Sequence, residues 1–482
     1  MDNTFEMVAK TFQGLEDVLA DELRALGAEN VVPGRRMVSF TGDKALLYRA
    51  NLQCRTALRI LKPFYKFRAR NTDELYAHVK EYDWSTLLDV DGSFAIDTVA
   101  NSEEFTHSHF VTYRVKDAIV DWFKDRHGAD FRPKVRLQDA DMMLNVHIAG
   151  DQVTISLDSS GESLHKRGYR VAQTEAPINE VLAAGIILRS GWRGESPLVD
   201  PMCGSGTFLI EAALIAANIA PGIFRSSFAF EHWKDFDKDL FQEIYNDDSG
   251  ERTPQFKIYG CDIAKQAIEI ATQNIKAAGV AKYIELERRS IADWTEAPQP
   301  AGVVITNPPY GERISAPDLD ALYVTIGSQL KHVFTGYHAW IIGYRDEHFA
   351  KIGLAPSQKI AVLNGALECS LREYELFAGD RRSFVRAGGK IGRGNDRPER
   401  KERSERRGPK GAKGFKGKGA SERRVERPAA VEESENPLAK RRNPDALKSI
   451  KGRTPQLAPQ EGPMMRSRGW RRKPSSDNTP QE

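Results

Sequence analysis

Apolar residues in the first 165 positions recur at two different spacings. A helix is predicted after Gly14, where they return every three or four residues, at Leu15, Val18, Leu19, Leu23 and Leu26. A later stretch alternates apolar and polar residues on both sides of Gly150-Asp151, which predicts a β-hairpin over about 144–157. This first part is typical of a mixed α+β region, and it offers neither a nucleophile with a base beside it nor a metal-ligand spacing.

The pattern changes at about residue 176, from which strands alternate with helices. Buried strands are predicted at Leu198–Asp200, Phe256–Cys261 and Val303–Thr306, and a helical stretch follows each of them. Two last strands, over 359–363 and 370–377, are joined across Asn364-Gly365 as a hairpin. Alternation of strand and helix indicates parallel βαβ units. We therefore predict an α/β, mostly parallel and doubly wound sheet that binds its ligands at the carboxyl ends of the strands.

The last hundred residues differ in charge from the rest of the chain. The net charge is +3, but about 29 of the 70 Lys and Arg residues and only about 14 of the 67 Asp and Glu residues fall in 379–482. The tail is therefore roughly +15 and the remainder roughly −12, and large apolar residues are sparse in the tail. We predict a disordered basic tail, which acts either as a nucleic-acid arm or only as a solvated appendage.

Composition disfavours membrane, secreted and metal-binding classes of protein. No apolar run approaches the ~18–20 residues that span a bilayer, and the first ten residues do not resemble a signal peptide. The four cysteines lie far apart with no C-x-x-C pair, which disfavours a structural metal site and a disulfide framework. We expect a cytoplasmic protein with no membrane span and no bound metal.

A glycine turn follows the first strand of the α/β region, in Asp200-Pro201-Met202-Cys203-Gly204-Ser205-Gly206-Thr207. A nucleotide-like cofactor meets a doubly wound sheet at such a turn, and Gly204 and Gly206 let the backbone approach the ligand closely. The next strand is followed by Asp262, whose carboxylate can accept hydrogen bonds from both hydroxyls of a ribose. The alternative role for Asp262 is a helix N-cap.

The most specific motif is Asn307-Pro308-Pro309-Tyr310-Gly311, at the end of a predicted strand. Its two prolines remove backbone donors, so the groups on offer are carbonyl acceptors and the Asn307 side chain. The Asn307 oxygen and the Pro308 carbonyl can each accept one N–H of a planar amino group, and Tyr310 offers a ring on which a base can stack. The motif therefore predicts a site that orients an amino group for attack, with a rigid turn as the alternative.

Two further segments leave alternatives open. Aromatic residues are dense over 224–245, which favours local packing over a part in a substrate cleft. The basic stretch Lys166-Arg167-Gly168-Tyr169-Arg170 lies between the two halves of the chain, and its charges either contact phosphate or are the solvated charges of an interdomain hinge.

Residues 1–378 resemble the THUMP-containing class I methyltransferases, and most closely the 23S ribosomal RNA guanine-N2 methyltransferases. The resemblance rests on six motifs in order. These are Phe12-Gln13-Gly14-Leu15-Glu16, Val115-Lys116-Asp117-Ala118-Ile119-Val120-Asp121, Leu164-His165-Lys166-Arg167-Gly168-Tyr169-Arg170, Ala176-Pro177-Ile178-Asn179-Glu180, the glycine turn from Asp200 to Thr207, and Asn307-Pro308-Pro309-Tyr310-Gly311-Glu312-Arg313.

The resemblance implies an N-terminal ferredoxin-like region (1–60), a THUMP RNA-binding domain (61–165) and a Rossmann-like class I methyltransferase domain (166–378), ahead of the tail (379–482). It implies S-adenosyl-L-methionine as cofactor and 23S ribosomal RNA, alone or within a pre-ribosomal particle, as partner. The implied cofactor residues are Asp200, Gly204, Gly206 and Asp262, with Ser290 or Asp293 at the adenine. The implied catalytic residues are Asn307, Pro308 and Tyr310.

Several rival functions remain at the level of the sequence. Some bacterial relatives continue into a second methyltransferase domain, in place of which this chain has the basic tail, so a second modification is not expected. The same chemistry also suits guanine N2 in tRNA, adenine N6 in DNA or a protein glutamine, although the THUMP-like first half disfavours the last two. A non-catalytic RNA-binding assembly factor is the rival from another class, and the intact glycine turn argues against it.

Overall fold

A computed structural model describes residues 4–137, 139–309, 316–365, 367–377 and 386, so the predicted tail lies almost wholly outside the described residues. The N-terminal part forms an eight-stranded sheet in the order β2-β3-β1-β4-β8-β7-β5-β6. Its strands are β1 (Phe5–Lys10), β2 (Glu29–Gly34), β3 (Met37–Gly42), β4 (Arg59–Arg68), β5 (Ser93–Asn101), β6 (Lys134–Val135), β7 (Met142–Ala149) and β8 (Gln152–Asp158). Its helices are α1 (Glu16–Ala25), α2 (Lys44–Gln53), α3 (Thr72–Glu81) and α4 (Ser108–His127).

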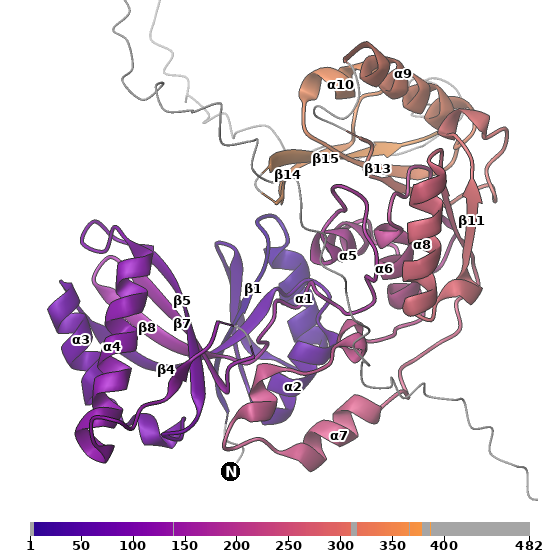
Figure 1. The fold of residues 1–482 in the computed structure, drawn as a ribbon. Helices are drawn as coiled ribbons and strands as arrows, with labels where there is room; N and C mark the ends of the chain where they lie inside the picture. Colours follow the sequence, from indigo (N-terminus) through magenta and orange to yellow (C-terminus); the bar gives the residue numbers. More distant parts are fainter. Residues whose placement is uncertain (1–3, 138, 310–315, 366, 378–385, 387–482) are drawn as a thin grey trace, which may run out of the picture. The chain divides into compact units, whose positions relative to one another are not determined.

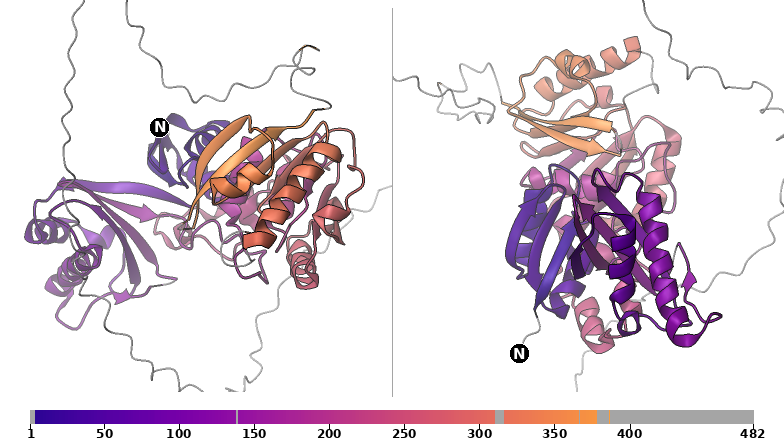
Figure 2. Two further views of the ribbon diagram at one scale, coloured as in Figure 1. Left: turned by 90° about the horizontal axis from the view of Figure 1, so that it is seen from above. Right: turned by 90° about the vertical axis from the view of Figure 1, so that its left-hand side faces the viewer.

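Strand β4 joins two halves of this sheet. It pairs with β1 at its beginning and with β8 along most of its length, both antiparallel. The boundary predicted between residues 60 and 61 falls inside this strand. The predicted hairpin is confirmed, because β7 and β8 pair antiparallel from Leu144↔Leu157 to Ala149↔Gln152. Helices α3 and α4 lie side by side on one face of this part of the sheet (Figures 1 and 2).

The second sheet has seven strands in the order β11-β10-β9-β12-β13-β15-β14. They are β9 (Leu198–Asp200), β10 (Ile258–Asp262), β11 (Ile284–Arg288), β12 (Val303–Thr306), β13 (His338–Gly343), β14 (Gln358–Asn364) and β15 (Leu367–Glu375). The helices are α5 (Glu180–Arg189), α6 (Thr207–Ala216), α7 (Lys238–Asn246), α8 (Lys265–Ala277), α9 (Ala316–His332) and α10 (Asp346–Lys351). The first five strands by sequence are parallel, and β15 runs antiparallel to its neighbours β13 and β14.

Helices cover this sheet on both faces, as predicted for a doubly wound fold. The central strands β9 and β12 are buried throughout, so successive side chains supply two separate cores. Leu198 and Ile305 pack in the core that holds α5, α6 and α8. Val199 and Val304 pack in the core that holds α9 and α10. The fold class predicted from the strand and helix alternation is confirmed.

The aromatic segment 224–245 packs within itself, as the sequence favoured, and also against the distant helix α2. The Phe230 ring stacks on Tyr48 of α2 with centroids 4.5 Å apart, and Phe241 meets the same tyrosine edge-on at 5.6 Å. Phe228 and Phe236 complete this cluster. The segment therefore stabilises the contact between the region of α7 and the N-terminal sheet. Sequence spacing could not identify Tyr48 as the partner, because it lies about 180 residues upstream.

No helix in the part of the chain that the structure describes is both long and apolar enough to cross a membrane. Over the same residues, His, Cys, Asp and Glu side chains form no cluster of three or more that could hold a metal ion.

Candidate active site

The strand order brings the predicted site residues to one edge of the second sheet. Strand β9 lies between β10 and β12, and all three are parallel, so their carboxyl ends meet. Asp200, Asp262 and Thr306 end these strands. Because the chain continues from β9 in one direction and returns with β12 on its other side, this edge is the topological switch point at which such sheets bind ligands.

Asp262 holds the glycine turn. One carboxylate oxygen, Oδ2, accepts a hydrogen bond from the Gly204 N–H at 3.0 Å, and Oδ1 accepts one from the Ala264 N–H at 2.9 Å. Helix α8 begins one residue later with Ala264 as its N-cap, so Asp262 closes the turn before the helix and is not itself the cap. Each carboxylate oxygen can accept a second hydrogen bond, which leaves capacity for two hydroxyls of a ligand.

The two glycines of the turn have different roles. Both have positive φ, +55° for Gly204 and +80° for Gly206. A Cβ on Gly206 would lie 3.2 Å from the Ala271 Cβ, so this glycine allows the turn to pack against α8. A Cβ on Gly204 would meet only the Thr174 hydroxyl, at 4.0 Å, so open space lies beside that residue. This space is where a ligand can approach the backbone.

Sequence reasoning missed Ile263, which follows Asp262. Its side chain is 68% exposed, an unusual state for an isoleucine at a strand end. An exposed apolar side chain beside the ribose-binding candidate provides a surface for a flat adenine ring. The signal that could have found it is an aliphatic residue directly after a strand-end acid.

Asp200 links the glycine turn to the next part of the site. Its side chain is 1% exposed, and its Oδ1 accepts hydrogen bonds from the Thr306 hydroxyl at 2.9 Å and from the Met202 N–H at 3.2 Å. Burial raises the pKa of the Asp200 carboxyl to about 7. The hydrogen bond from Thr306 to Asp200 connects the ends of β9 and β12. A contact between Asp200 and the cofactor stays a prediction.

Asn307 presents an acceptor that lacks a partner. It follows directly after β12, and its Oδ1 atom is buried with no hydrogen-bond partner among the described residues. Leaving a buried acceptor unsatisfied costs about 1–3 kcal/mol, so such an atom points to a donor from a ligand. Pro308 beside it is buried. Tyr310, the third predicted catalytic residue, lies outside the described residues.

Ser290 and Asp293 follow β11, the neighbour of β10 at the same edge. They pair with each other around a short 3₁₀ turn at Ile291–Asp293. The Asp293 Oδ2 accepts the Ser290 N–H at 3.2 Å, and the Ser290 Oγ accepts the Ala292 N–H at 3.2 Å. Which of the two contacts an adenine stays a prediction.

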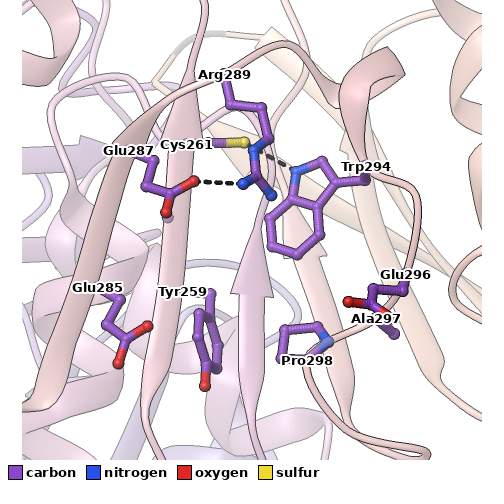
Figure 3. A pocket seen from close by; sticks show the side chains of 10 residues that line it. Tyr259, Cys261, Glu285, Glu287, Arg289, Trp294, Glu296, Ala297 and Pro298 are labelled. Carbon is purple, nitrogen blue, oxygen red and sulfur yellow. Dashed lines mark hydrogen bonds and ion pairs between the residues drawn. The ribbon is translucent and has the colours of Figure 1, made fainter.

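A pocket of about 390 Å³ opens on the face of β10 and β11 below this edge (Figure 3). Tyr259 and Trp294 form part of its wall, and the Arg289 guanidinium pairs with Glu287 at 2.6 Å. The Trp294 Nε1–H donates to the Cys261 sulfur at 3.2 Å. None of the predicted site residues lines this pocket.

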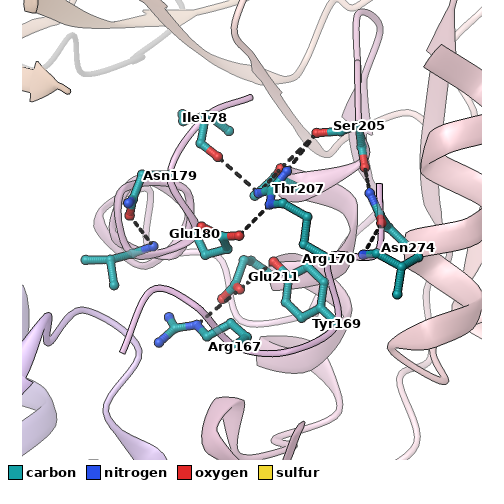
Figure 4. Close-up of polar contacts among 12 residues, drawn as sticks. Arg167, Tyr169, Arg170, Ile178, Asn179, Glu180, Ser205, Thr207, Glu211 and Asn274 are labelled. Atoms are coloured by element: carbon teal, nitrogen blue, oxygen red, sulfur yellow. Dashed lines mark hydrogen bonds and ion pairs between the residues drawn. The ribbon is translucent and has the colours of Figure 1, made fainter. Parts of the chain in front are cut away.

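In the basic stretch 166–170, Arg167 is buried and Arg170 is half-buried, each beside an acidic partner (Figure 4). Lys166 is exposed. Arg167 is 2% exposed and pairs with Glu211, which also accepts the Tyr169 hydroxyl at 2.8 Å. Arg170 pairs with Glu180 at 2.6 Å. Both sequence interpretations, phosphate contact and solvated hinge, are therefore wrong for Arg167 and Arg170. Their acidic partners lie on α5 and α6 and carry no signal in the local sequence.

Comparison with known proteins places the chain in a family. Three family models match in succession: an RlmL ferredoxin-like domain over 6–61, a THUMP domain over 69–158, and an RMKL-like methyltransferase domain over 167–373. A candidate RNA methyltransferase of Synechocystis sp., slr0064, is 41% identical over 372 residues, which cover 77% of this chain and 96% of that protein. The chain belongs to the RMKL-like family of RNA methyltransferases.

Two more relatives of this RMKL-like methyltransferase provide information about chain length and cofactor. The ribosomal RNA large subunit methyltransferase K/L of Syntrophotalea carbinolica is 39% identical over 389 residues, which cover 78% of this chain but 54% of that protein. The crystal structure of SMU.472, a candidate methyltransferase complexed with SAH, has a TM-score of 0.70 and 33% identity and covers 79% of this chain and 100% of its own. The fold is that of an S-adenosylmethionine-dependent methyltransferase. Asp262, the space beside Gly204 and the exposed Ile263 fit that cofactor.

Proposed function

We propose that this RMKL-like protein methylates the exocyclic N2 of a guanine in 23S ribosomal RNA. The observation that carries the proposal is the buried Oδ1 of Asn307 at the switch point, which has no hydrogen-bond partner among the described residues. Guanine N2 is a planar amino group with two N–H donors, and Asn307 Oδ1 and the Pro308 carbonyl offer two acceptors. The likeness to a ribosomal RNA large subunit methyltransferase supports 23S RNA as the molecule that carries the guanine.

The residues of this chain would act by orienting the target amino group. S-adenosylmethionine, held at Asp262, Gly204 and Ile263, would supply an electrophilic methyl group. The lone pair of guanine N2 is delocalised into the ring, so the free amine is a weak nucleophile. Two acceptors that hold both N–H groups would point that lone pair along one direction, and most of the rate gain would come from this preorganised geometry. Neither acceptor is a base, so the extra proton would leave to water.

The THUMP domain distinguishes between the alternative acceptors. It matches residues 69–158, and a module of this kind supports RNA over DNA or a protein glutamine. The binding features at Gly204, Asp262 and Asn307 support an enzyme over a non-catalytic assembly factor. Guanine N2 in tRNA is the closest rival, because the same geometry would serve it.

Nucleoside mass spectrometry with site mapping tests the proposal. We expect 23S RNA from cells that lack this protein to lose one N2-methylguanosine, and the wild-type gene but not one encoding Asn307→Ala to restore it. A lost N2-methylguanosine in tRNA would favour the rival acceptor, and a lost N6-methyladenosine would overturn the amino-group assignment. Purified enzyme given either naked 23S RNA or pre-ribosomal particles would then identify the form of the substrate.

Strand β6 is a candidate surface for RNA. It forms one edge of the N-terminal sheet, and it lies in the sequence Phe131-Arg132-Pro133-Lys134-Val135-Arg136-Leu137. Its three cationic side chains, Arg132, Lys134 and Arg136, are exposed, and none of them forms an ion pair or hydrogen bond within the described residues. Exposed apolar side chains alternate with them, Phe131 at 57% and Leu137 at 88%. Unpaired cations beside an exposed ring suit phosphates and unstacked bases.

Charge removal on this edge is expected to weaken RNA binding in a salt-dependent way. The triple variant Arg132→Gln, Lys134→Gln and Arg136→Gln should make the negative slope of log affinity against log salt shallower by about 2. Each phosphate contact that is lost no longer releases its counterions on binding. The matched control removes three exposed cations that already have acidic partners, Arg24, Lys66 and Lys265. Filter binding over a salt series measures the slopes, and equal slopes for the two triples would contradict the assignment.

A further inference from the structure

Asn274 of α8 joins two segments that are distant in sequence. Its side chain is 1% exposed and makes four hydrogen bonds. The Oδ1 accepts the N–H groups of Val171 and Ala172 at 2.9 and 3.1 Å, and the Nδ2 donates to the carbonyls of Ala172 and Ser205 at 2.9 and 3.0 Å. A carboxamide has two acceptor and two donor positions, so this side chain is saturated. No other residue type of this length offers the same set.

Arg170 contacts the same glycine turn from the other side (Figure 4). Its Nη1 donates to the Ser205 hydroxyl at 3.0 Å, and its Nη2 donates to the Thr207 hydroxyl at 2.9 Å. The guanidinium is itself held by Glu180 through Nε at 2.6 Å and by the Ile178 carbonyl through Nη2 at 3.2 Å. Its planar fork therefore spans two hydroxyls of the turn in a fixed orientation.

Both contacts act on the part of the turn that has unusual backbone geometry. Ser205 lies between Gly204 and Gly206, both of which have positive φ. Because glycine is conformationally permissive, the backbone on either side of Ser205 could adopt many other conformations if nothing held it. Asn274 fixes the Ser205 carbonyl and Arg170 fixes its hydroxyl. A turn that is ordered before the cofactor arrives loses less conformational entropy on binding.

We infer that Arg170 and Asn274 are positioning residues that preorganise the glycine turn for S-adenosylmethionine. Through them the segment 167–172, which follows the THUMP domain in the chain, is hydrogen-bonded to the cofactor turn. Cofactor affinity thereby depends on residues that do not touch the cofactor. The inference rests on the proposed placement of the cofactor at Gly204 and Asp262.

The neighbouring cluster provides a matched control. Tyr169 is 2% exposed, and its hydroxyl donates to Glu211, with no hydrogen bond to the glycine turn. Tyr169→Phe removes one buried hydrogen bond from the same segment and therefore reports the effect of a loss of stability alone. Arg170→Lys keeps the positive charge beside Glu180 but loses the fork that spans Ser205 and Thr207.

Calorimetry with S-adenosylhomocysteine, together with thermal unfolding, tests the inference on the full chain. We expect Arg170→Lys to weaken S-adenosylhomocysteine binding about tenfold, with a melting temperature close to that of Tyr169→Phe, whose affinity stays near wild type. Ser205→Ala should weaken binding as well. Its combination with Arg170→Lys should bind little more weakly than Arg170→Lys alone, because the lysine variant has already lost the contact with the Ser205 hydroxyl. The KM for S-adenosylmethionine should rise while the KM for RNA stays unchanged.

Two results would overturn the inference. The first is wild-type affinity in both Arg170→Lys and Ser205→Ala. The second is an equal loss of affinity in Tyr169→Phe, which would make the effect one of stability. Asp262→Asn serves as the reference for the cofactor placement. If it weakens binding while Arg170→Lys does not, the positioning role fails alone, and if neither weakens binding, the cofactor placement itself fails.

Discussion

Asn307→Ala is expected to lower the turnover number about 100-fold or more while S-adenosylmethionine affinity changes little. The Asn307 Oδ1 is a buried acceptor with no hydrogen-bond partner in the described part of the chain, and the alanine variant would leave one N–H of the target amino group unheld. The amino group would then lose its fixed orientation in the transition state. Single-turnover methylation at saturating RNA measures the effect on the chemical step, and calorimetry with S-adenosylhomocysteine checks that the cofactor site is intact.

Two controls separate a lost hydrogen bond to the target base from damage to the fold. Asn307→Asp keeps an oxygen acceptor at the same place, so it should retain more activity than the alanine variant at a pH where the carboxyl is protonated. Thermal unfolding should show little change in Asn307→Ala, because the replaced oxygen has no partner within the described residues. Turnover near that of the wild type in Asn307→Ala would remove Asn307 from the site.

Asp262→Ala is expected to weaken S-adenosylmethionine binding about tenfold to a hundredfold. Loss of a charged acceptor for two ribose hydroxyls costs about 1.5–3 kcal/mol, which corresponds to that change in Kd. The variant also frees the N–H groups of Gly204 and Ala264, so the glycine turn itself becomes less ordered. Calorimetry gives the affinity, and the melting temperature gives the separate cost to the fold.

Asp262→Asn separates the two contributions. Its single carbonyl oxygen can still accept one of the two backbone N–H groups, but it carries no charge and places an NH₂ group where a hydroxyl would donate. We expect an affinity between those of the wild type and Asp262→Ala. Unchanged affinity in both variants would show that the ribose is held elsewhere.

The strands that carry the site could be predicted because their signals are local. Val303–Thr306 is a β-branched run that only Asn307 separates from a proline pair, and the structure has β12 with the same bounds. The hairpin across Asn364-Gly365 also appears, as β14 and β15. The helical stretch predicted after Leu198–Asp200 is α6, which ends at Ala216, shortly before Asn218 takes a positive φ of 52°.

Contacts over long sequence distances could not be predicted. A buried arginine and a solvated one have the same local sequence, so the partners of Arg167 and Arg170 emerged only from the packing of α5 and α6. The four hydrogen bonds of Asn274 span up to 103 residues, and nothing near that residue distinguishes it from a surface asparagine. In a single sequence, residues that hold a site in place through buried hydrogen bonds carry weaker signals than residues that face the ligand.

The shared strand β4 has a consequence for how the N-terminal half responds to stress. Its first residues hydrogen-bond to β1 and its later residues to β8, so one continuous ladder crosses from the ferredoxin-like to the THUMP part. Pulling either part away would break that ladder and expose unpaired edges on both sides. We therefore expect the two parts to melt in one cooperative step, and a ligand bound to one of them to raise the unfolding temperature of both.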